Sequence, residues 1–283
     1  MRPTLSGADR YFLGYRPAEQ ERLQQQAEQL AEEARRLFER IGVGPGARVL
    51  EIGCGPRGCL DLLAERVGPT GTVVGVERSE DSVNRARKLV AERSLGNIEV
   101  LHVDGRHTAL ARSSFDFVTA RLVLVNVPAP EEIVVEAVAL VRPGGTVAFH
   151  EADAVAHVFD PPLPAWARLN NVLQAYAKLN GIDSFIGRRV PRLLRDHGLV
   201  DIHINPLIYV YPPGHARRTL SLHFVENLKD RLLAQHLIEE RDLNALMEDL
   251  RRHLENPETV VLSHLFIQAW GRKPDMTDRG SSS

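Results

Sequence analysis

Short runs of consecutive apolar residues alternate along the chain with segments of helical periodicity, and this alternation most constrains the fold. Unbroken apolar runs are typical of strands that helices cover on both faces. The order of strand and helix therefore predicts an α/β protein with a doubly wound, mostly parallel sheet. The predicted strands are residues 48–52, 72–77, 98–102, 115–120 and 146–150, and the predicted helices between them are residues 59–67, 81–95 and 131–141.

Helical periodicity also dominates the two flanks of this pattern. One amphipathic helix is predicted over residues 18–41, and helical blocks over 163–179 and 217–254 bracket a further helix and strand. We interpret the two blocks as insertions that roof the carboxyl edge of the sheet. The predicted division is an N-terminal helical cap (1–44), a cofactor-binding core (45–155), a helical lid insertion (156–184), a core helix and strand (185–212), a second helical insertion (213–257), a final core strand (258–274) and a disordered tail (275–283).

Charge and cysteine content narrow the classes of function. The 35 basic and 37 acidic residues give a formal net charge of −2 without a long basic stretch, so nucleic acid is not a predicted partner. No apolar run has the length of a membrane span and the N-terminus has no signal-peptide core, which predicts a cytoplasmic protein without membrane contact. Cys54 and Cys59 have no further Cys or His ligands near them, so we predict no metal site.

The residues that follow the predicted strands indicate the function, because such a sheet binds its ligand at the carboxyl ends of its strands. Gly53, Cys54 and Gly55 follow the first strand, where glycines let the backbone approach a ligand and the next helix offers its amide groups. Glu77 ends the second strand, 22 positions after Gly55. A carboxylate at that place can accept hydrogen bonds from ribose hydroxyls.

Two cofactors fit an adenosine-binding edge of this kind. Asp104 and Gly105 follow the third strand, and we expect them beside the exocyclic amine of an adenine. Glu51 ends the first strand, two residues before the first glycine, and separates the two candidates. It would repel the pyrophosphate of a nicotinamide dinucleotide, whereas it would attract the ammonium of the methionine tail of S-adenosylmethionine. The sequence therefore favours S-adenosylmethionine.

Several segments resemble those of class I S-adenosylmethionine-dependent methyltransferases. They are VLEIGCGPRG, similar to the first motif; VVGVERS, similar to the ribose-binding motif that holds Glu77 and Arg78; VLHVDG, similar to the adenine-side motif; FDFVTARLVLVNVPAP, similar to the fourth strand and its loop; and LVRPGGTVAFHEADA, similar to the segment into the fifth strand. GRRVPRLLRDHGLVDI and LSHLFIQAWGRKP resemble the usual ending of the family. The resemblance implies a Rossmann-like sheet of seven strands, the last inserted antiparallel, with S-adenosylmethionine as cofactor.

The N-terminal segment YFLGYRPAEQERLQQQA resembles a leader of bacterial small-molecule methyltransferases. The resemblance implies that Tyr11 or Tyr15 covers the sulfonium and that Arg22 or Gln26 lies near the methionine tail. The alternative is an ordinary helix start with a solvated face. The apolar stripe of the helix either covers the active site or packs on a distant face or on another subunit, so a homo-oligomer is a further hypothesis.

Candidate catalytic residues follow the fifth strand: His150, Glu151 and Asp153. Methyl transfer is an in-line displacement that needs alignment and exclusion of water, and only a weakly acidic acceptor needs a base. His150 is the candidate base, with a structural histidine as the alternative, and alternation along a strand places it opposite Glu151. Arg121, after the fourth strand, either contacts backbone or an anion at the cofactor edge or pairs with one of the two acids.

Three aromatic residues, Trp166, Tyr176 and Tyr209, are predicted to line a substrate pocket, with core packing as the alternative. The predicted function is transfer of a methyl group from S-adenosylmethionine to an oxygen, nitrogen or carbon of a small molecule, interpreted as a secondary metabolite. Two alternatives remain open at this stage. One is a nicotinamide-dependent oxidoreductase, and the other is a methyltransferase-like protein that binds the cofactor without transferring methyl.

Overall fold

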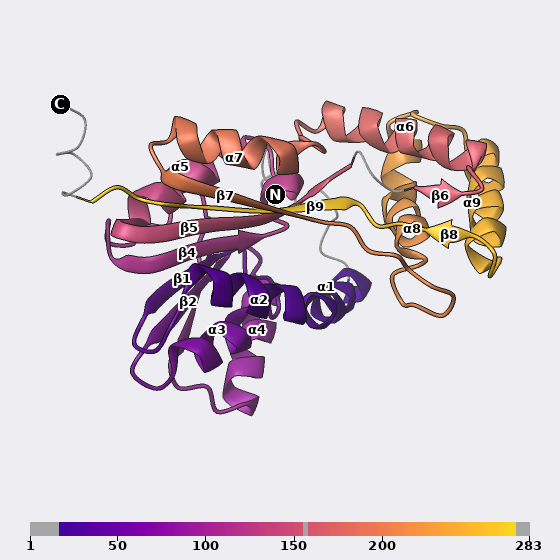
Figure 1. Cartoon of the computed structure of the whole chain (residues 1–283). Helices are drawn as coiled ribbons and strands as arrows, with labels where there is room; N and C mark the ends of the chain where they lie inside the picture. The colour runs from indigo at the N-terminus through magenta and orange to yellow at the C-terminus, as the bar shows by residue number, and fades with distance from the viewer. Residues whose placement is uncertain (1–16, 155–157, 276–283) are drawn as a thin grey trace, which may run out of the picture.

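A single large sheet organises the chain. The computed structural model describes residues 17–154 and 158–275. Seven strands form this sheet in the order β3 (Ile98–His102), β2 (Thr72–Glu77), β1 (Arg48–Ile52), β4 (Phe115–Arg121), β5 (Val141–Asp153), β9 (Leu265–Arg272) and β7 (Val200–Leu207). Neighbours from β3 to β5 pair in parallel, whereas β9 runs antiparallel to β5 and to β7 (Figure 1). The predicted doubly wound, mostly parallel sheet with one reversed strand is confirmed.

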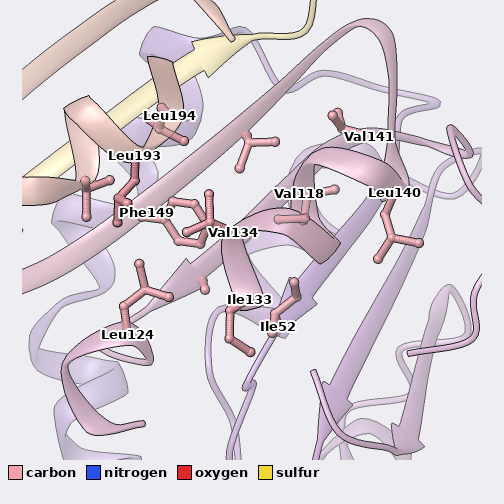
Figure 2. Packing of buried hydrophobic residues seen from close by; sticks show 14 of the residues in the cluster. Ile52, Val118, Leu124, Ile133, Val134, Leu140, Val141, Phe149, Leu193 and Leu194 are labelled. Carbon is pink, nitrogen blue, oxygen red and sulfur yellow. The ribbon is translucent and has the colours of Figure 1, made fainter. Parts of the chain in front are cut away.

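Helices cover both faces of this sheet. They are α2 (Ala31–Ile41), α3 (Leu60–Val67), α4 (Glu80–Glu92), α5 (Pro130–Leu140) and α7 (Ile186–Asp196). On the face of α5 and α7, Phe149 of β5 lies beside Val134 and Leu193 (Figure 2). On the other face, Phe38 of α2 meets Phe117 of β4 edge to face, with ring centroids 5.8 Å apart. The central strands β1, β2, β4 and β5 have apolar side chains on both faces of the sheet, and their sequences are therefore nearly unbroken apolar runs.

The predicted N-terminal helix is two helices, α1 (Pro17–Gln29) and α2, separated at Leu30. The backbone of Leu30 leaves helical geometry, with φ −104° and ψ 11°, while its side chain is fully buried. Residues of α2 pack on the sheet, whereas Leu23 of α1 lines the cavity described below. One straight helix cannot serve both surfaces. The apolar stripe of α2 is thus covered within the chain.

Two strands differ from the prediction. The strand predicted over residues 146–150 is longer, because β5 begins at Val141, and Gly144 in its first part donates its amide to the Lys273 carbonyl at 2.8 Å. The predicted final strand is split into the short β8 (Val260–Val261) and β9. Between them the chain changes partner, since β8 pairs with β6 (Phe159–Asp160) and β9 with the main sheet.

A second group of helices lies at the end of the sheet where the parallel strands finish. It contains α6 (Pro164–Leu179), α8 (Leu220–Ala234) and α9 (Glu240–Glu255), together with the β6–β8 pair (Figure 1). This group has its own apolar core, which includes Leu169, Val225, Leu243, Leu250 and Val261. Among the described residues, no helix has the length and apolar character needed to cross a membrane.

Arg218 ties this helical group together from within. Its side chain is buried and donates to four backbone carbonyls at 2.7–2.8 Å: Leu254, Tyr211, Asn256 and Thr259. Two of these carbonyls belong to the end of α9 and its cap, where a helix leaves acceptors open. A buried arginine satisfied in this way links three segments that are distant in the sequence.

Replacing Arg218 by Met is expected to lower the free energy of unfolding by about 3–5 kcal/mol, because the buried carbonyls lose their donors. Urea titration followed by circular dichroism measures this change. The matched control is Arg252→Met, which removes an exposed ion pair with Asp249 and should cost less than about 0.5 kcal/mol. Equal effects of the two substitutions would contradict the assigned role of Arg218.

Candidate active site

One cavity opens at the carboxyl ends of β1, β2, β3 and β4. Parallel pairing makes these strands end at the same edge of the sheet. Nine of the ten predicted cofactor-binding residues line this cavity: Glu51, Gly53, Cys54, Gly55, Glu77, Arg78, Asp104, Gly105 and Arg121. The tenth, Tyr11, and the pocket candidate Tyr15 lie outside the described residues.

The turn after β1 is fixed to β2 and leaves one face open. The amides of Gly53 and Cys54 both donate to the Val76 carbonyl, at 2.8 and 3.1 Å. Gly53 and Gly55 have φ values of +68° and +58°, a region that favours glycine. A Cβ on Gly53 would lie 2.5 Å from a methyl carbon of Val123, whereas a Cβ on Gly55 would meet nothing within 4 Å. Gly55 therefore presents bare backbone to the cavity.

Glu51 is buried beneath this turn. The Cys59 amide donates to both carboxylate oxygens of Glu51, each 2.9 Å away. Burial raises the pKa of Glu51 to about 7, although the charge of Arg121 and the Cys59 amide lower it. Arg121 itself donates to the carbonyls of Gly58, at 3.0 Å, and Leu30, at 3.4 Å. Within the described ranges Arg121 forms no ion pair, so its predicted pairing with an acid at the end of β5 is not formed.

Two further carboxylates lie at the ends of β2 and β3. Glu77 accepts hydrogen bonds from the amides of Gly55, at 3.1 Å, and Ser79, at 2.7 Å. Burial raises the pKa of Glu77 against the influence of these amides. Asp104 faces the guanidinium of Arg106, with Nη2 at 2.6 Å, and this contact lowers the pKa of Asp104. Sequence reasoning missed Arg106, although its place two residues after Asp104 was a signal.

Beyond the strand ends the cavity continues into a chamber between α1, α6 and α8. The apolar side chains of this chamber are Leu23, Ala27, Trp166, Leu173, Phe224, Leu228 and Phe266. Its polar side chains include Gln26, Asn170, Gln174, Arg217 and His264. The sequence predicted Trp166 in the pocket but missed the residues at and just before α8. Periodicity located that helix without showing which face meets a cavity.

Two predicted pocket aromatics do not line the cavity, which corrects the expectation for them. Tyr176 is buried on α6 and packs with Leu228 and Leu232. Tyr209 packs on Phe266 with ring centroids 6.0 Å apart, and its hydroxyl is buried. Both side chains contribute to packing, the alternative that the sequence left open.

The two acids at the end of β5 hold backbone and a helix instead of facing the cavity. Glu151 is fully buried and accepts from three consecutive amides of residues 123–125, at 3.0, 3.0 and 3.2 Å. Burial raises the pKa of Glu151 to about 8, although these amides lower it. Asp153 accepts from Arg188 at the start of α7, with Nε and Nη2 both 2.7 Å away. Neither acid is in place to contact a bound substrate.

His150 is also buried outside the cavity lining. Its ring packs against Phe266, with centroids 5.6 Å apart, and neither ring nitrogen has a hydrogen-bond partner in the described part of the chain. Burial lowers the pKa of His150 to about 3, and the charges of Arg121 and Arg217 add to this effect. Such a histidine stays neutral at physiological pH and accepts a proton poorly, so the expected base is not in position.

The fold is a Rossmann-like α/β sheet with a cavity at the carboxyl edge of its parallel strands. Residues 44–198, more than half of the 283, match the protein family described as a methyltransferase domain. The chain therefore belongs to this family, whose class I members use S-adenosylmethionine. The cofactor predicted from the sequence is confirmed.

Curated relatives share this part of the chain. Nocamycin O-methyltransferase of Saccharothrix syringae is 36% identical over 148 residues, which are 51% of each protein. Demethylmenaquinone methyltransferase of Listeria monocytogenes is 31% identical over 134 residues, 47% of this chain and 54% of the relative. The chain spans about half the length of the curated relatives it matches.

Solved structures share the fold over most of the chain. Phosphoethanolamine N-methyltransferase 2 of Haemonchus contortus, in complex with phosphomonomethylethanolamine and S-adenosylhomocysteine, has a TM-score of 0.56 at 16% identity. The match covers 84% of this chain and 52% of that one. A SAM-dependent methyltransferase from Aquifex aeolicus has a TM-score of 0.52 at 20% identity, and the match covers 70% of this chain and 93% of that one. At these identities the likeness shows the fold alone.

Replacing Glu151 by Ala is expected to lower the free energy of unfolding by about 2–4 kcal/mol, because three amides, one buried and two half-buried, lose their acceptor. Glu151→Gln keeps one carbonyl acceptor and imitates the protonated acid, so it should cost about 1 kcal/mol or less. Urea titration at neutral pH compares the two variants. A Gln variant as unstable as the Ala variant would show that the full carboxylate is required.

Proposed function

We propose that this protein transfers the methyl group of S-adenosylmethionine to a small-molecule acceptor, a secondary metabolite in our interpretation. The observation that carries the proposal is one cavity that contains bare backbone at Gly55 together with the buried carboxylate of Glu51 and the half-buried carboxylate of Glu77. The names of the relatives, one of them an O-methyltransferase and another a demethylmenaquinone methyltransferase, support methyl transfer.

The cavity suits this cofactor in charge and in shape. When bound, S-adenosylmethionine supplies an electrophilic methyl group on a sulfonium. In the proposal, Glu51 pairs with the ammonium of the methionine tail, and the open face of Gly55 leaves room for that tail. Glu77 accepts hydrogen bonds from the ribose hydroxyls, and Asp104 and Gly105 border the adenine. A pyrophosphate would meet repulsion at Glu51, which argues against a nicotinamide cofactor.

The chamber between α1, α6 and α8 takes the acceptor in this proposal. Its apolar wall excludes water and aligns the acceptor with the methyl group, the two requirements of an in-line displacement. His150, Glu151 and Asp153 lie outside the lining. We therefore assign them no proton transfer and attribute the protein's contribution to binding and alignment.

Binding and turnover measurements test this function. Calorimetry with the full chain should show saturable binding of S-adenosylhomocysteine and none of NAD or NADH. Methyl-labelled S-adenosylmethionine, incubated with a panel of small organic acceptors, should yield a labelled product and S-adenosylhomocysteine in equal amounts. Binding of NADH alone would overturn the proposal. Cofactor binding without transfer to any acceptor would favour a protein that keeps the cofactor without this chemistry.

Replacing Gly55 by Val is expected to abolish measurable binding of S-adenosylhomocysteine, because the side chain would occupy the open face of the turn. Gly214→Val is the matched control: Gly214 also has a positive φ, +81°, and open space around it, but does not line the cavity. Both variants carry the same kind of backbone strain. If both variants bind the cofactor equally well, the turn after β1 is not part of the cofactor-binding site.

Affinity for S-adenosylmethionine should increase up to about tenfold per pH unit between about pH 5 and pH 7 and level off above. Burial raises the pKa of Glu51 to about 7, so below that pH the free protein must lose a proton before the carboxylate can pair with the ammonium. Calorimetry in matched buffers measures this slope. Glu51→Gln has no such proton to lose, and a slope that persists in that variant would assign the pH dependence to another group.

A further inference from the structure

Charge is unevenly distributed along the cavity. All acids in its described lining lie at the strand ends: Glu51, Glu77 and Asp104. Within the described lining, the chamber between α1, α6 and α8 contains no acid but two arginines, Arg217 and Arg22, the second of which donates to Gln26 and lies over the ring of Phe224. The strand ends also contain three arginines, Arg78, Arg106 and Arg121, which match these acids in number, whereas the acceptor end is basic.

Arg217 is buried with neutral partners only. It lies just before α8 and is 5% exposed. Its Nε donates to the side-chain oxygen of Gln29 at 2.9 Å, and Nη1 lies 3.4 Å from the Tyr211 hydroxyl. The guanidinium also lies over the ring of Phe266, 5.8 Å from its centroid. In the described part of the chain, Nη2 makes no hydrogen bond and the side chain forms no ion pair.

The next residue shows what a structurally satisfied buried arginine looks like in the same helical group. Arg218, also 5% exposed, donates to four carbonyls with all three of its nitrogens. Arg217 has two such contacts, one of them long, and its remaining donors are left for the cavity that it lines. A guanidinium stays charged under all ordinary conditions. Its burial therefore costs free energy unless an anion pairs with it.

No acid in the described part of the chain forms an ion pair with Arg217. Burial raises the pKa of Tyr209. The charge of Glu33 raises this pKa further and the charge of Arg217 lowers it, so both charged side chains lie near Tyr209. Glu33 nevertheless forms no ion pair with Arg217 in the described structure, and one of its carboxylate oxygens is buried without a partner. The open donors of Arg217 therefore face the chamber and not a neighbouring carboxylate.

We propose that the methyl acceptor is an organic anion with an apolar body, and that Arg217 binds its charged oxygen. This inference rests on the proposed function. The apolar body would lie against Trp166, Leu173, Phe224 and Leu228 of the chamber. A carboxylate can engage two guanidinium nitrogens at once, which would both hold and orient the acceptor. Arg217 is thus the residue that selects acidic over neutral acceptors.

A matched pair of probes tests this selection: 2-naphthoate and its neutral isostere 2-naphthamide. Each is titrated by calorimetry into the full chain saturated with S-adenosylhomocysteine. We expect 2-naphthoate to bind the unaltered protein at least about tenfold more tightly than the amide. In Arg217→Met this preference should disappear, and in Arg217→Lys part of it should remain. Arg168→Met, which removes a surface ion pair with Asp242, should keep the full preference.

The affinity for S-adenosylhomocysteine should be the same in all of these variants, since the contacts of Arg217 are with Gln29, Tyr211 and Phe266 and not with the residues assigned to the cofactor. A purely structural role of Arg217 would weaken both probes equally in Arg217→Met, and that result would overturn the inference. Equal affinity of the two probes for the unaltered protein, or no saturable binding of 2-naphthoate at millimolar concentration, would also overturn it while cofactor binding stands. Failure to bind S-adenosylhomocysteine at all would remove the proposed function itself and the inference with it.

Discussion

Parallel pairing of β1 with β2 and β4 sets the position of every polar group at the cofactor edge. The register aligns Ile52 with Val76 and with Ala120, so the three strands end at one level. The turn after β1 donates two amides to the Val76 carbonyl and is therefore fixed by the same pairing. Glu77 and Arg121, at the ends of the neighbouring strands, converge on that turn. The geometry of this edge therefore follows from the pairing of the sheet.

This dependence explains which features could be predicted from the sequence. The strand at residues 72–77 and the glycine turn have local signals, because apolar runs and glycines determine them within a few positions. The break at Leu30 has no such signal. Leu23 and Phe38 belong to one periodic stripe, yet the first lines the cavity and the second packs on the sheet. Which surface covers a stripe depends on contacts between distant segments, and a single sequence does not contain that information in readable form.

The end of β5 illustrates a second limit of sequence reasoning. Alternation along a strand predicts that His150 and Glu151 point to opposite faces, and the structure places one against Phe266 and the other against the amides of residues 123–125. The alternation does not predict that both side chains are buried away from the cavity. Polar residues next to an active site can therefore serve to build its walls, and the fully buried carboxylate of Glu151 holds the loop that contributes Val123 to the lining.

Arg217 and Arg218 also show that a single sequence does not identify the partners of a side chain. The two residues are adjacent and identical, yet they have different partners. The carbonyls that satisfy Arg218 come from the end of α9 and from segments on either side of it, whereas Arg217 meets α1, Phe266 and the open chamber. One arginine stabilises the helical group, and the other gives the chamber a positive charge that no acid of its described lining matches. A guanidinium in the chamber would orient an anionic acceptor relative to the bound cofactor before any chemistry takes place.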